Sequence, residues 1–198
     1  MQLVVGLGNP GQRYAANRHN IGFMAVNEIV RQYNLPNFQK KNRLQSDFSE
    51  GIIGSRKVVL IKPLSFMNCS GKPIGDTMRY FRLNPSDIFV FHDEMDIPEG
   101  CLRVKKGGGH AGHNGIRDIE NHIGREFWRI RLGVGKPLNK KKVIAHVLGN
   151  FSKLDHIWLL PILEAIANKL PILLDGATSD YMSSVTSKLS QLKRKEER

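Results

Sequence analysis

The chain has almost no cysteine and no long apolar run. Cys69 and Cys101 are its only cysteines, and their spacing excludes a disulfide framework and favours reduced thiols in a cytosol. No apolar stretch reaches the roughly 18 residues of a membrane span. Met1 and Gln2 lead directly into an apolar segment with no basic region before it, so we expect no signal peptide. These absences predict a cytoplasmic protein.

Negative charge is also scarce. The 18 acidic residues are outnumbered by 30 lysines and arginines, which gives a formal net charge of +12. A charge of this size attracts polyanions without identifying them. Nucleic acid is the leading candidate partner. No strongly amphipathic basic helix stands out, so an acidic membrane surface is not the expected partner.

The order of apolar and turn-forming segments predicts the fold class. With 198 residues, 40% of them hydrophobic, the chain is expected to form one domain, residues 1–198. Strands and helices alternate early, while a hairpin around Gly54 and Ser55 requires antiparallel pairing. We therefore expect a three-layer α/β domain with a mixed, twisted central sheet flanked by helices. The expected strands are 3–6, 44–53, 57–61, 87–92, 101–105 and 129–134.

The sequence predicts fewer helices than strands. Apolar periodicity and caps predict helices at 21–33, 70–81 and 116–123. A capping-box pattern at Ser152 and Asp155 predicts another, which continues toward residue 169. The basic tail, residues 188–198, has the composition of a frayed helix end without a specific role.

The first strand runs into a turn whose glycines match a dinucleotide-binding fingerprint. Gly6, Gly8 and Gly11 have the spacing G-x-G-x-x-G. That motif needs its third glycine inside the first turn of a helix, whereas here a Pro-Gly turn intervenes and helical periodicity begins near Ile21. The acidic residue expected about 20 positions later is also missing. The pattern therefore predicts a tight loop that presents Asn9.

Three loops at strand ends are rich in Asn, Asp and His. If their strands are parallel neighbours, the loops meet at one sheet edge, where open α/β proteins bind ligands. An imidazole base, a carboxylate that orients it and amides that polarise a carbonyl suit acyl transfer to water. The loops contain Asn9 and His19, then Asn68, then Asp93 with His110, His113 and Asn114.

Other chemistries have weaker support, and each polar residue taken singly is compatible with a structural role. His110 and His113 could bind a metal with Asp93 or Cys101, but neither paired zinc ligands nor an HExxH pattern is present. A serine hydrolase would need a G-x-S-x-G elbow, which is missing. The cysteines lack the activating surroundings of a nucleophile.

Three stretches form long, specific motifs: GLGNPGQRYAANRHNIGF, KPLSFMNCSG and FHDEMDIPEGCLRVKKGGGHAGHNGIRDI. Together they closely resemble the bacterial-type peptidyl-tRNA hydrolases. A weaker match, RIRLGVGKP…VIAHVLGNFS, extends the resemblance to about residue 152. The resemblance implies an esterase that hydrolyses the bond between a peptide and the 3′ end of tRNA. It also implies a monomer without a metal or organic cofactor.

The resemblance further implies roles for individual residues. His19 is the implied general base, Asp93 its supporting carboxylate, and Asn9 the residue that distinguishes N-blocked aminoacyl groups from free ones. Substrate contacts near the ester and in the peptide groove are implied for Tyr14, Phe66, Met67, Asn68 and Asn114. The acceptor-end phosphate contacts are implied for Lys105 and Arg131, with residues 140–142 nearby.

The strand that contains Arg131 alternates basic and apolar residues, so Arg129 and Arg131 share a face. If that face is exposed to solvent, both arginines are free to meet phosphate. A noncatalytic RNA-binding module is the alternative function, in which the Asn-rich loops only read bases. Readers of single-stranded RNA commonly present aromatic stacking platforms. Tyr14 and Phe66 are too few for that interpretation to be preferred.

Overall fold

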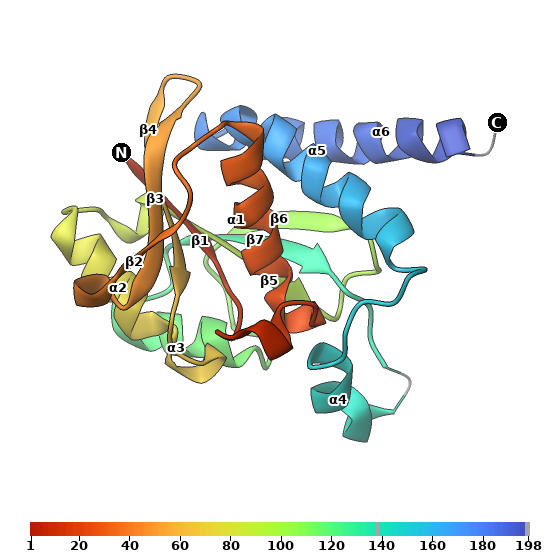
Figure 1. Cartoon of the computed structure of the whole chain (residues 1–198), viewed down its shortest axis with the longest axis horizontal. Coiled ribbons are helices and arrows are strands. Elements are labelled where there is room, and N and C mark those ends of the chain that lie inside the picture. Colours follow the sequence, from red (N-terminus) through yellow and green to blue (C-terminus); the bar gives the residue numbers. More distant parts are fainter. Residues whose placement is uncertain (138, 197–198) are drawn as a thin grey trace.

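The computed structural model describes residues 1–137 and 139–196, without the side chains of residues 140 and 191–196. One seven-stranded sheet forms the centre, in the order β2-β3-β4-β1-β5-β7-β6 (Figure 1). β1 pairs in parallel with β4 and β5, and β5 with β7, whereas the outer pairs are antiparallel. The predicted mixed α/β sheet is confirmed. The strands are β1 (Gln2–Gly6), β2 (Gln39–Lys41), β3 (Ser46–Ile53), β4 (Arg56–Pro63), β5 (Ile88–Glu94), β6 (Leu102–Lys106) and β7 (Trp128–Gly133).

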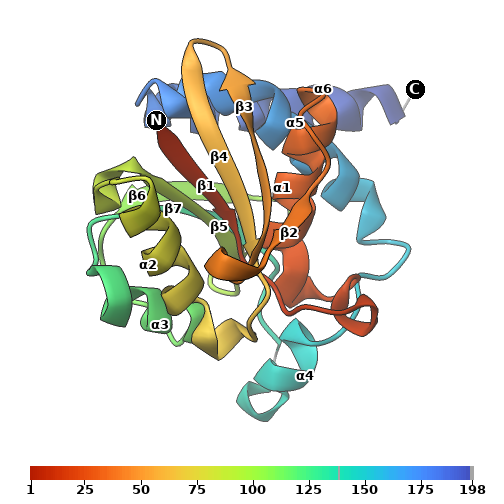
Figure 2. The same ribbon diagram turned by 60° about the vertical axis from the view of Figure 1, so that its left-hand side comes forward.

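Helices cover both faces of the sheet, which makes the predicted three layers (Figure 2). On one face, α1 (Ile21–Gln32), α5 (His156–Leu174) and α6 (Thr178–Glu196) share a core with Val4 of β1. On the other, α2 (Gly71–Tyr80) and α3 (Asn114–Ile123) share a core with Leu3 and Val5. Successive strand residues point to opposite faces, so covered strands must be apolar on both. β5 is accordingly buried along its whole length.

The predicted helices α1, α2 and α3 are confirmed to within about two residues at each end. The two bonds of the predicted capping box form in the turn just before α5: Ser152 N donates to Asp155 Oδ2 at 2.7 Å, and Asp155 N donates to Ser152 Oγ at 3.2 Å. α5 runs beyond the expected end to Leu174. One strand and two α-helices were missed: β2, the short α4 (Val143–Val147) and α6.

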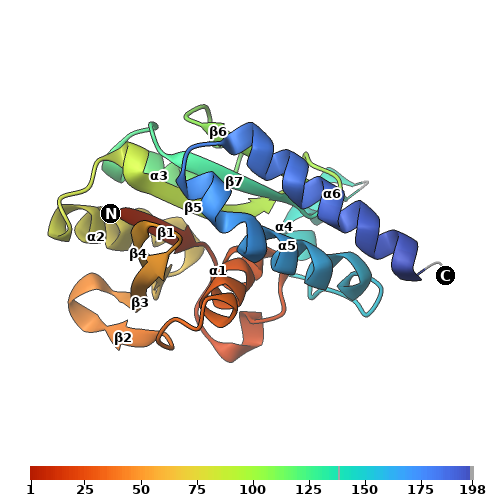
Figure 3. The same ribbon diagram turned by 90° about the horizontal axis from the view of Figure 1, so that it is seen from above.

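α6 is a long helix that lies alongside α5 (Figure 3) and includes most of the expected tail, residues 188–198. The side chains of the tail from residue 191 onward lie outside the described part of the chain. α5 is long and apolar enough to span a membrane by length and composition. This is weak evidence for a span, because half of its apolar window is buried and its inner residues belong to the core of the sheet.

A close backbone contact between β1 and α1 brings the end of the sheet to the start of the helix. A Cβ on Gly22 would lie 2.2 Å from Phe91 O and 2.5 Å from Leu7 N, and one on Gly6 would lie 2.4 Å from Gly22 O. The interlocked glycines allow Phe23 N to donate to Leu7 O at 3.1 Å. The first glycine of the dinucleotide-like pattern therefore serves helix packing.

We expect Gly22→Ala to destabilise the protein by about 3 kcal/mol, because backbone atoms cannot rotate away from the added methyl group. In an exposed helix the same change is favourable by up to about 1 kcal/mol. Gly75→Ala in α2 is the matched control, since its Cβ would meet only side-chain atoms at 3.3 Å or more. Urea unfolding followed by circular dichroism measures both. Equal midpoints for Gly22→Ala and wild type would contradict the close contact.

Candidate active site

The three polar loops converge at the carboxyl ends of β1, β4 and β5, which are adjacent and parallel. Asn9 Oδ1, from the loop after β1, accepts a hydrogen bond from Met67 N, from the loop after β4, at 2.8 Å. The rings of Tyr14 and Phe66 meet edge to face, with centroids 6.3 Å apart. The structure thus brings together the residues of the first two loops, as the parallel arrangement predicts.

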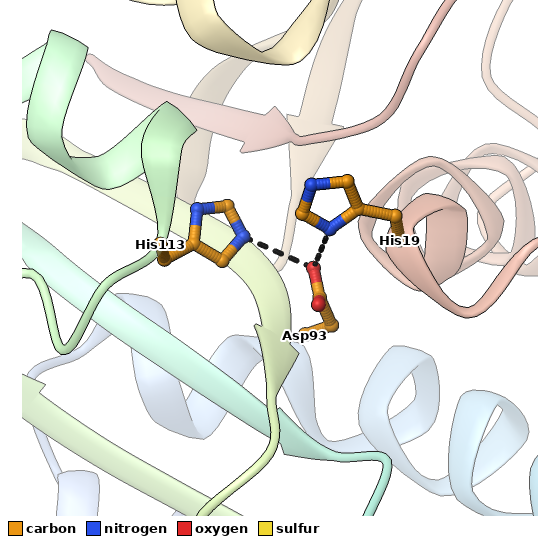
Figure 4. A group of neighbouring side chains, drawn as sticks. All are labelled: His19, Asp93 and His113. Carbon is orange, nitrogen blue, oxygen red and sulfur yellow. Dashed lines mark hydrogen bonds and ion pairs between the residues drawn. The ribbon is translucent and has the colours of Figure 1, made fainter. Parts of the chain in front are cut away.

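A buried carboxylate joins the first loop to the third. Asp93 lies at the end of β5, and its Oδ1 is 2.8 Å from His19 Nδ1 and 3.0 Å from His113 Nε2 (Figure 4). His19 comes from the short 3-10 helix η2 (Arg18–Asn20) before α1, and His113 is the N-cap of α3. One carboxylate oxygen therefore faces two imidazoles from different elements. The sequence motifs contained His113, but no role in the reaction was predicted for it.

Hydrogen bonding assigns the protons of this cluster. His113 Nδ1 accepts from Ile116 N at 3.2 Å, so His113 in its neutral form has its proton on Nε2 and donates it to Asp93. The carboxylate also accepts from His19 Nδ1–H. In its neutral form, His19 then has its lone pair on Nε2. This is the tautomer that a general base needs.

Burial and charge act in opposite directions on the groups of this cluster. Burial opposes ionisation of Asp93, but the attraction of His19 and His113 and their hydrogen bonds outweigh it, so the pKa of Asp93 lies well below its ordinary value. Burial lowers the pKa of His19, whereas the charge and hydrogen bond of Asp93 raise it, to a net value above 6.5. Asp93 is therefore a carboxylate at neutral pH. His92 stays neutral there, because burial and the neighbouring His113 hold its pKa well below 6.5.

Asn9 is held from two sides. Asn9 N donates to Asn20 Oδ1 at 3.0 Å, and Asn20 Nδ2 donates back to Asn9 O at 2.9 Å. With its Oδ1 bound to Met67 N, Asn9 has a fixed amide orientation. Its Nδ2 makes no hydrogen bond to any residue that the structure describes, so it can donate to a ligand. Sequence reasoning missed Asn20; its position directly after His19 was the available signal.

A cavity of about 170 Å³ opens beside the cluster. His19, Asp93 and Asn114 lie in its wall, and α4, which the sequence did not predict, closes another side. Asn68 and Phe66 are exposed, while Met67 is buried beneath them. The remaining lining residues are Glu94, Met95, Ala111, Gly112, His113, Val143, Ile144 and Val147.

Comparisons with known proteins identify the family. A family model for peptidyl-tRNA hydrolase matches residues 3–195. The peptidyl-tRNA hydrolase of Rhodospirillum rubrum is 48% identical over 187 residues, which cover 94% of this chain and 76% of that protein. The one from Rhizobium meliloti is 50% identical over 185 residues, with 93% and 77% covered. The chain belongs to the peptidyl-tRNA hydrolase family.

The solved structures agree with this assignment. The crystal structure of peptidyl-tRNA hydrolase from Acinetobacter baumannii matches with a TM-score of 0.88 at 35% identity, covering 93% of this chain and 94% of that one. This chain is therefore a hydrolase that acts on the ester bond of peptidyl-tRNA. The resemblance seen in the sequence motifs is confirmed, and the noncatalytic RNA-binding alternative is not.

The expected phosphate-binding face of this peptidyl-tRNA hydrolase differs from the prediction. Arg129 is not exposed: its side chain is 1% accessible and pairs with Glu120 of α3 at 3.0 Å. α3 covers this end of β7, which the alternation of the strand could not reveal. Arg131 is 21% accessible and pairs with the buried Glu94 at 2.8 Å. The condition that this strand face is exposed to solvent is therefore not met at Arg129 and only partly met at Arg131.

Lys105 of β6 lies half-buried next to this pair of arginines. Burial, and then the charges of Arg131 and Arg129, lower its pKa. Lys141 and Lys142 are exposed before α4, while the side chain of residue 140 lies outside the described part of the chain. Lys105 and Arg131 are therefore partly accessible, whereas Arg129 is buried.

The only described side chains that could together hold a metal ion in this peptidyl-tRNA hydrolase are His19, Asp93 and His113, whose polar atoms lie within 4.8 Å of one another. His110 belongs to no such group, and its Nδ1 accepts from Gly112 N at 3.0 Å. Both nitrogens of His113 and Nδ1 of His19 already take part in hydrogen bonds. An ion would have to displace the two bonds to Asp93 Oδ1.

We expect Asp93→Asn to lower the pKa of His19 from above 6.5 to below 6.5, because burial then acts without the opposing carboxylate. NMR titration of the His19 ring protons measures the change. Asp96→Asn is the matched control, since Asp96 is exposed and pairs with Lys136. The interpretation is wrong if His19 titrates at the same pH in Asp93→Asn and wild type.

Proposed function

We propose that this enzyme cleaves peptidyl-tRNA by attack of a water molecule that His19 activates. The observation that supports this is the 2.8 Å hydrogen bond from His19 Nδ1 to Asp93, which leaves Nε2 as the free base. Nε2 takes a proton from water while the water oxygen bonds to the carbonyl carbon. The bond from that carbon to the 3′ oxygen of the terminal ribose then breaks, and the ribose oxygen takes the proton from His19.

Asp93 is proposed to orient His19 and to stabilise the imidazolium that forms during attack. The charge and hydrogen bond of Asp93 raise the pKa of His19 against the effect of burial, which makes the imidazole a stronger base. His113 donates to the same oxygen, so it shares the carboxylate with His19 and limits how far the pKa of His19 rises. The pKa of His19 is therefore set by Asp93 and His113 together.

The amides of Asn9, Asn68 and Asn114 are proposed to recognise the acylated end of the substrate. Asn9 has a fixed orientation and a free Nδ2, which suits donation to the carbonyl of a peptide bond. An N-blocked aminoacyl group has that carbonyl and a free aminoacyl-tRNA lacks it. Tyr14 and Phe66 form an aromatic edge next to the ester, and Met67 supports the peptide groove beneath them.

Lys105 and Arg131 are proposed to hold the acceptor-end phosphate, and the net charge of +12 to attract the body of the tRNA. Glu94 orients Arg131 by accepting from its Nε at 2.9 Å and pairing with its Nη2. Nη1 of Arg131 makes no bond to the described residues and can donate to phosphate. The bound Glu94 therefore supports the phosphate role by fixing the guanidinium in place.

The reaction is proposed to need no metal or organic cofactor, because a base, a water molecule and amide donors supply all the groups that ester hydrolysis requires. The hydrogen bonds within the His19–Asp93–His113 cluster account for its closeness without an ion. We further propose that the enzyme acts as a monomer in the cytoplasm.

Deacylation of N-acetyl-aminoacyl-tRNA tests this mechanism. His19→Ala should lower kcat at least about 100-fold, the low end of general base catalysis, while the Kd for tRNA stays within about threefold. His156→Ala is the matched control, because that histidine is exposed at the start of α5. A rate above about a tenth of wild type in His19→Ala would rule out the base. Wild-type activity should persist in EDTA; its loss, with recovery on adding a divalent metal, would rule out the cofactor-free reaction.

The salt dependence of KM tests the phosphate contacts. Each contact contributes a slope of roughly 0.7–0.9 in log affinity against log salt, so removing Lys105 and Arg131 should flatten the slope by about one to two units. Since Arg131→Ala would leave Glu94 unpaired, we choose Lys105→Ala with Arg131→Gln and Glu94→Gln. We expect a higher KM and a kcat within about threefold of wild type.

Lys57→Ala, at the exposed far end of the β3–β4 hairpin, controls for the loss of one surface charge. If the triple variant has the same salt slope as wild type, Lys105 and Arg131 do not contact the tRNA phosphate and are ordinary surface charges.

A further inference from the structure

Arg129 is a buried charged residue that the proposed reaction does not use. Its guanidinium makes two bonds, each with a different terminal nitrogen. Nη1 donates to the backbone oxygen of Gly109 at 2.7 Å, and Nη2 pairs with Glu120 Oε1 at 3.0 Å. Its Nε has no partner in the described part of the chain. The two terminal nitrogens therefore link a loop carbonyl to a carboxylate of α3.

The loop that contains Gly109 has few other means of holding its position. Gly107 and Gly108 have φ values of +67° and +91°, and no atom lies within 4 Å of where a Cβ on Gly109 would be. The backbone bond from Gly107 N to Phe127 O, at 3.1 Å, attaches the start of the loop to the chain before β7. The hydrogen bond from Arg129 Nη1 to Gly109 O holds the middle of the loop. Four residues beyond Gly109, the same loop delivers His113 to Asp93.

Glu120 lies on the other side of His113 in the sequence. It belongs to α3, which begins at Asn114 with His113 as its N-cap. Arg129 thus holds the chain before His113 through Gly109 and the chain after it through Glu120. Its own strand, β7, pairs with β5, and Asp93 lies opposite Leu132 in that pairing. A short rigid path therefore connects Asp93, Arg129 and both flanks of His113.

We propose that Arg129, together with Glu120, is a positioning residue that sets the place of His113 and Asn114 relative to Asp93. The proposal rests on the proposed function for its effect on turnover, although the position of His113 can be measured without catalysis. A planar guanidinium presents two donors at a fixed separation, which a lysine ammonium cannot do. A buried ion pair is in general a poor source of stability compared with apolar residues of similar volume. We therefore infer that the Arg129–Glu120 pair fixes the positions of the loop and α3 and adds little to stability.

Two variants test the proposal. Arg129→Lys keeps the charge and loses the two-donor geometry, and it loses no bond at Nε because none is present there. The double variant Arg129→Met with Glu120→Leu removes both charges, so neither is left buried without a partner. Circular dichroism and the thermal midpoint establish that each variant is folded. We expect kcat for N-acetyl-aminoacyl-tRNA to fall about tenfold in both, with a KM change of less than about threefold.

The position of His113 is read from the ring ¹⁵N resonances. Wild type should show a proton on Nε2 and an accepting Nδ1, and this signature should be lost or averaged in both variants. Arg125→Met is the matched control, because Arg125 pairs with the same Glu120 at 3.3 Å but is 67% accessible and makes no bond to the loop. It should keep the wild-type kcat and resonances.

The outcomes separate a positioning role from a structural one. Unchanged His113 resonances in the folded Arg129→Lys and double variants would overturn the proposal, whatever their turnover. So would an equal effect of Arg125→Met, because the charge on Glu120 would then be the cause. Failure of the general-base mechanism is detected separately, as near-normal turnover in His19→Ala.

Discussion

The carboxylate of Asp93 is the group on which the rest of the site depends. It is 3% accessible, and a buried anion without partners is strongly unfavourable. The two imidazoles that stabilise it come from the segment before α1 and from the N-cap of α3. The ion can therefore exist in this place only when β5, α1 and α3 are packed together.

The hydrogen bonds around Asp93 distinguish the two histidines by how many of their ring nitrogens are occupied. His113 has both nitrogens occupied, one by Asp93 and one by the backbone of α3. His19 lies in the cavity wall and uses only Nδ1 among the described hydrogen bonds, so its Nε2 has no partner there. The same carboxylate thus supports one histidine that is structural and one that is available as a base. Asn20, next to His19, exchanges two hydrogen bonds with Asn9 and so connects the segment of His19 to Asn9.

The basic residues of the protein divide into two groups that composition cannot separate. Most of the 30 lysines and arginines are expected to form an ordinary basic surface that favours solubility. Arg129 and Arg131, two residues apart on one strand face, have distinct partners: Glu120 from α3 for the first, and Glu94 from β5 for the second. Arg129 is buried and also donates to the backbone oxygen of Gly109. Arg131 keeps 21% of its side chain accessible.

The sequence by itself determined the fold class, the main strands, the first three helices and the family, because apolar periodicity, turn residues and long motifs are local properties. It also placed Asn9, His19 and Asp93 at strand ends, where a parallel sheet brings loops together. Only the tertiary structure decided that Asp93 serves two histidines, that Asn20 orients Asn9, and that α4 closes the cavity. It also decided that Arg129 is buried. Each of these depends on which distant segment packs against a residue, and the pattern along a single strand contains no information about the helix that covers it.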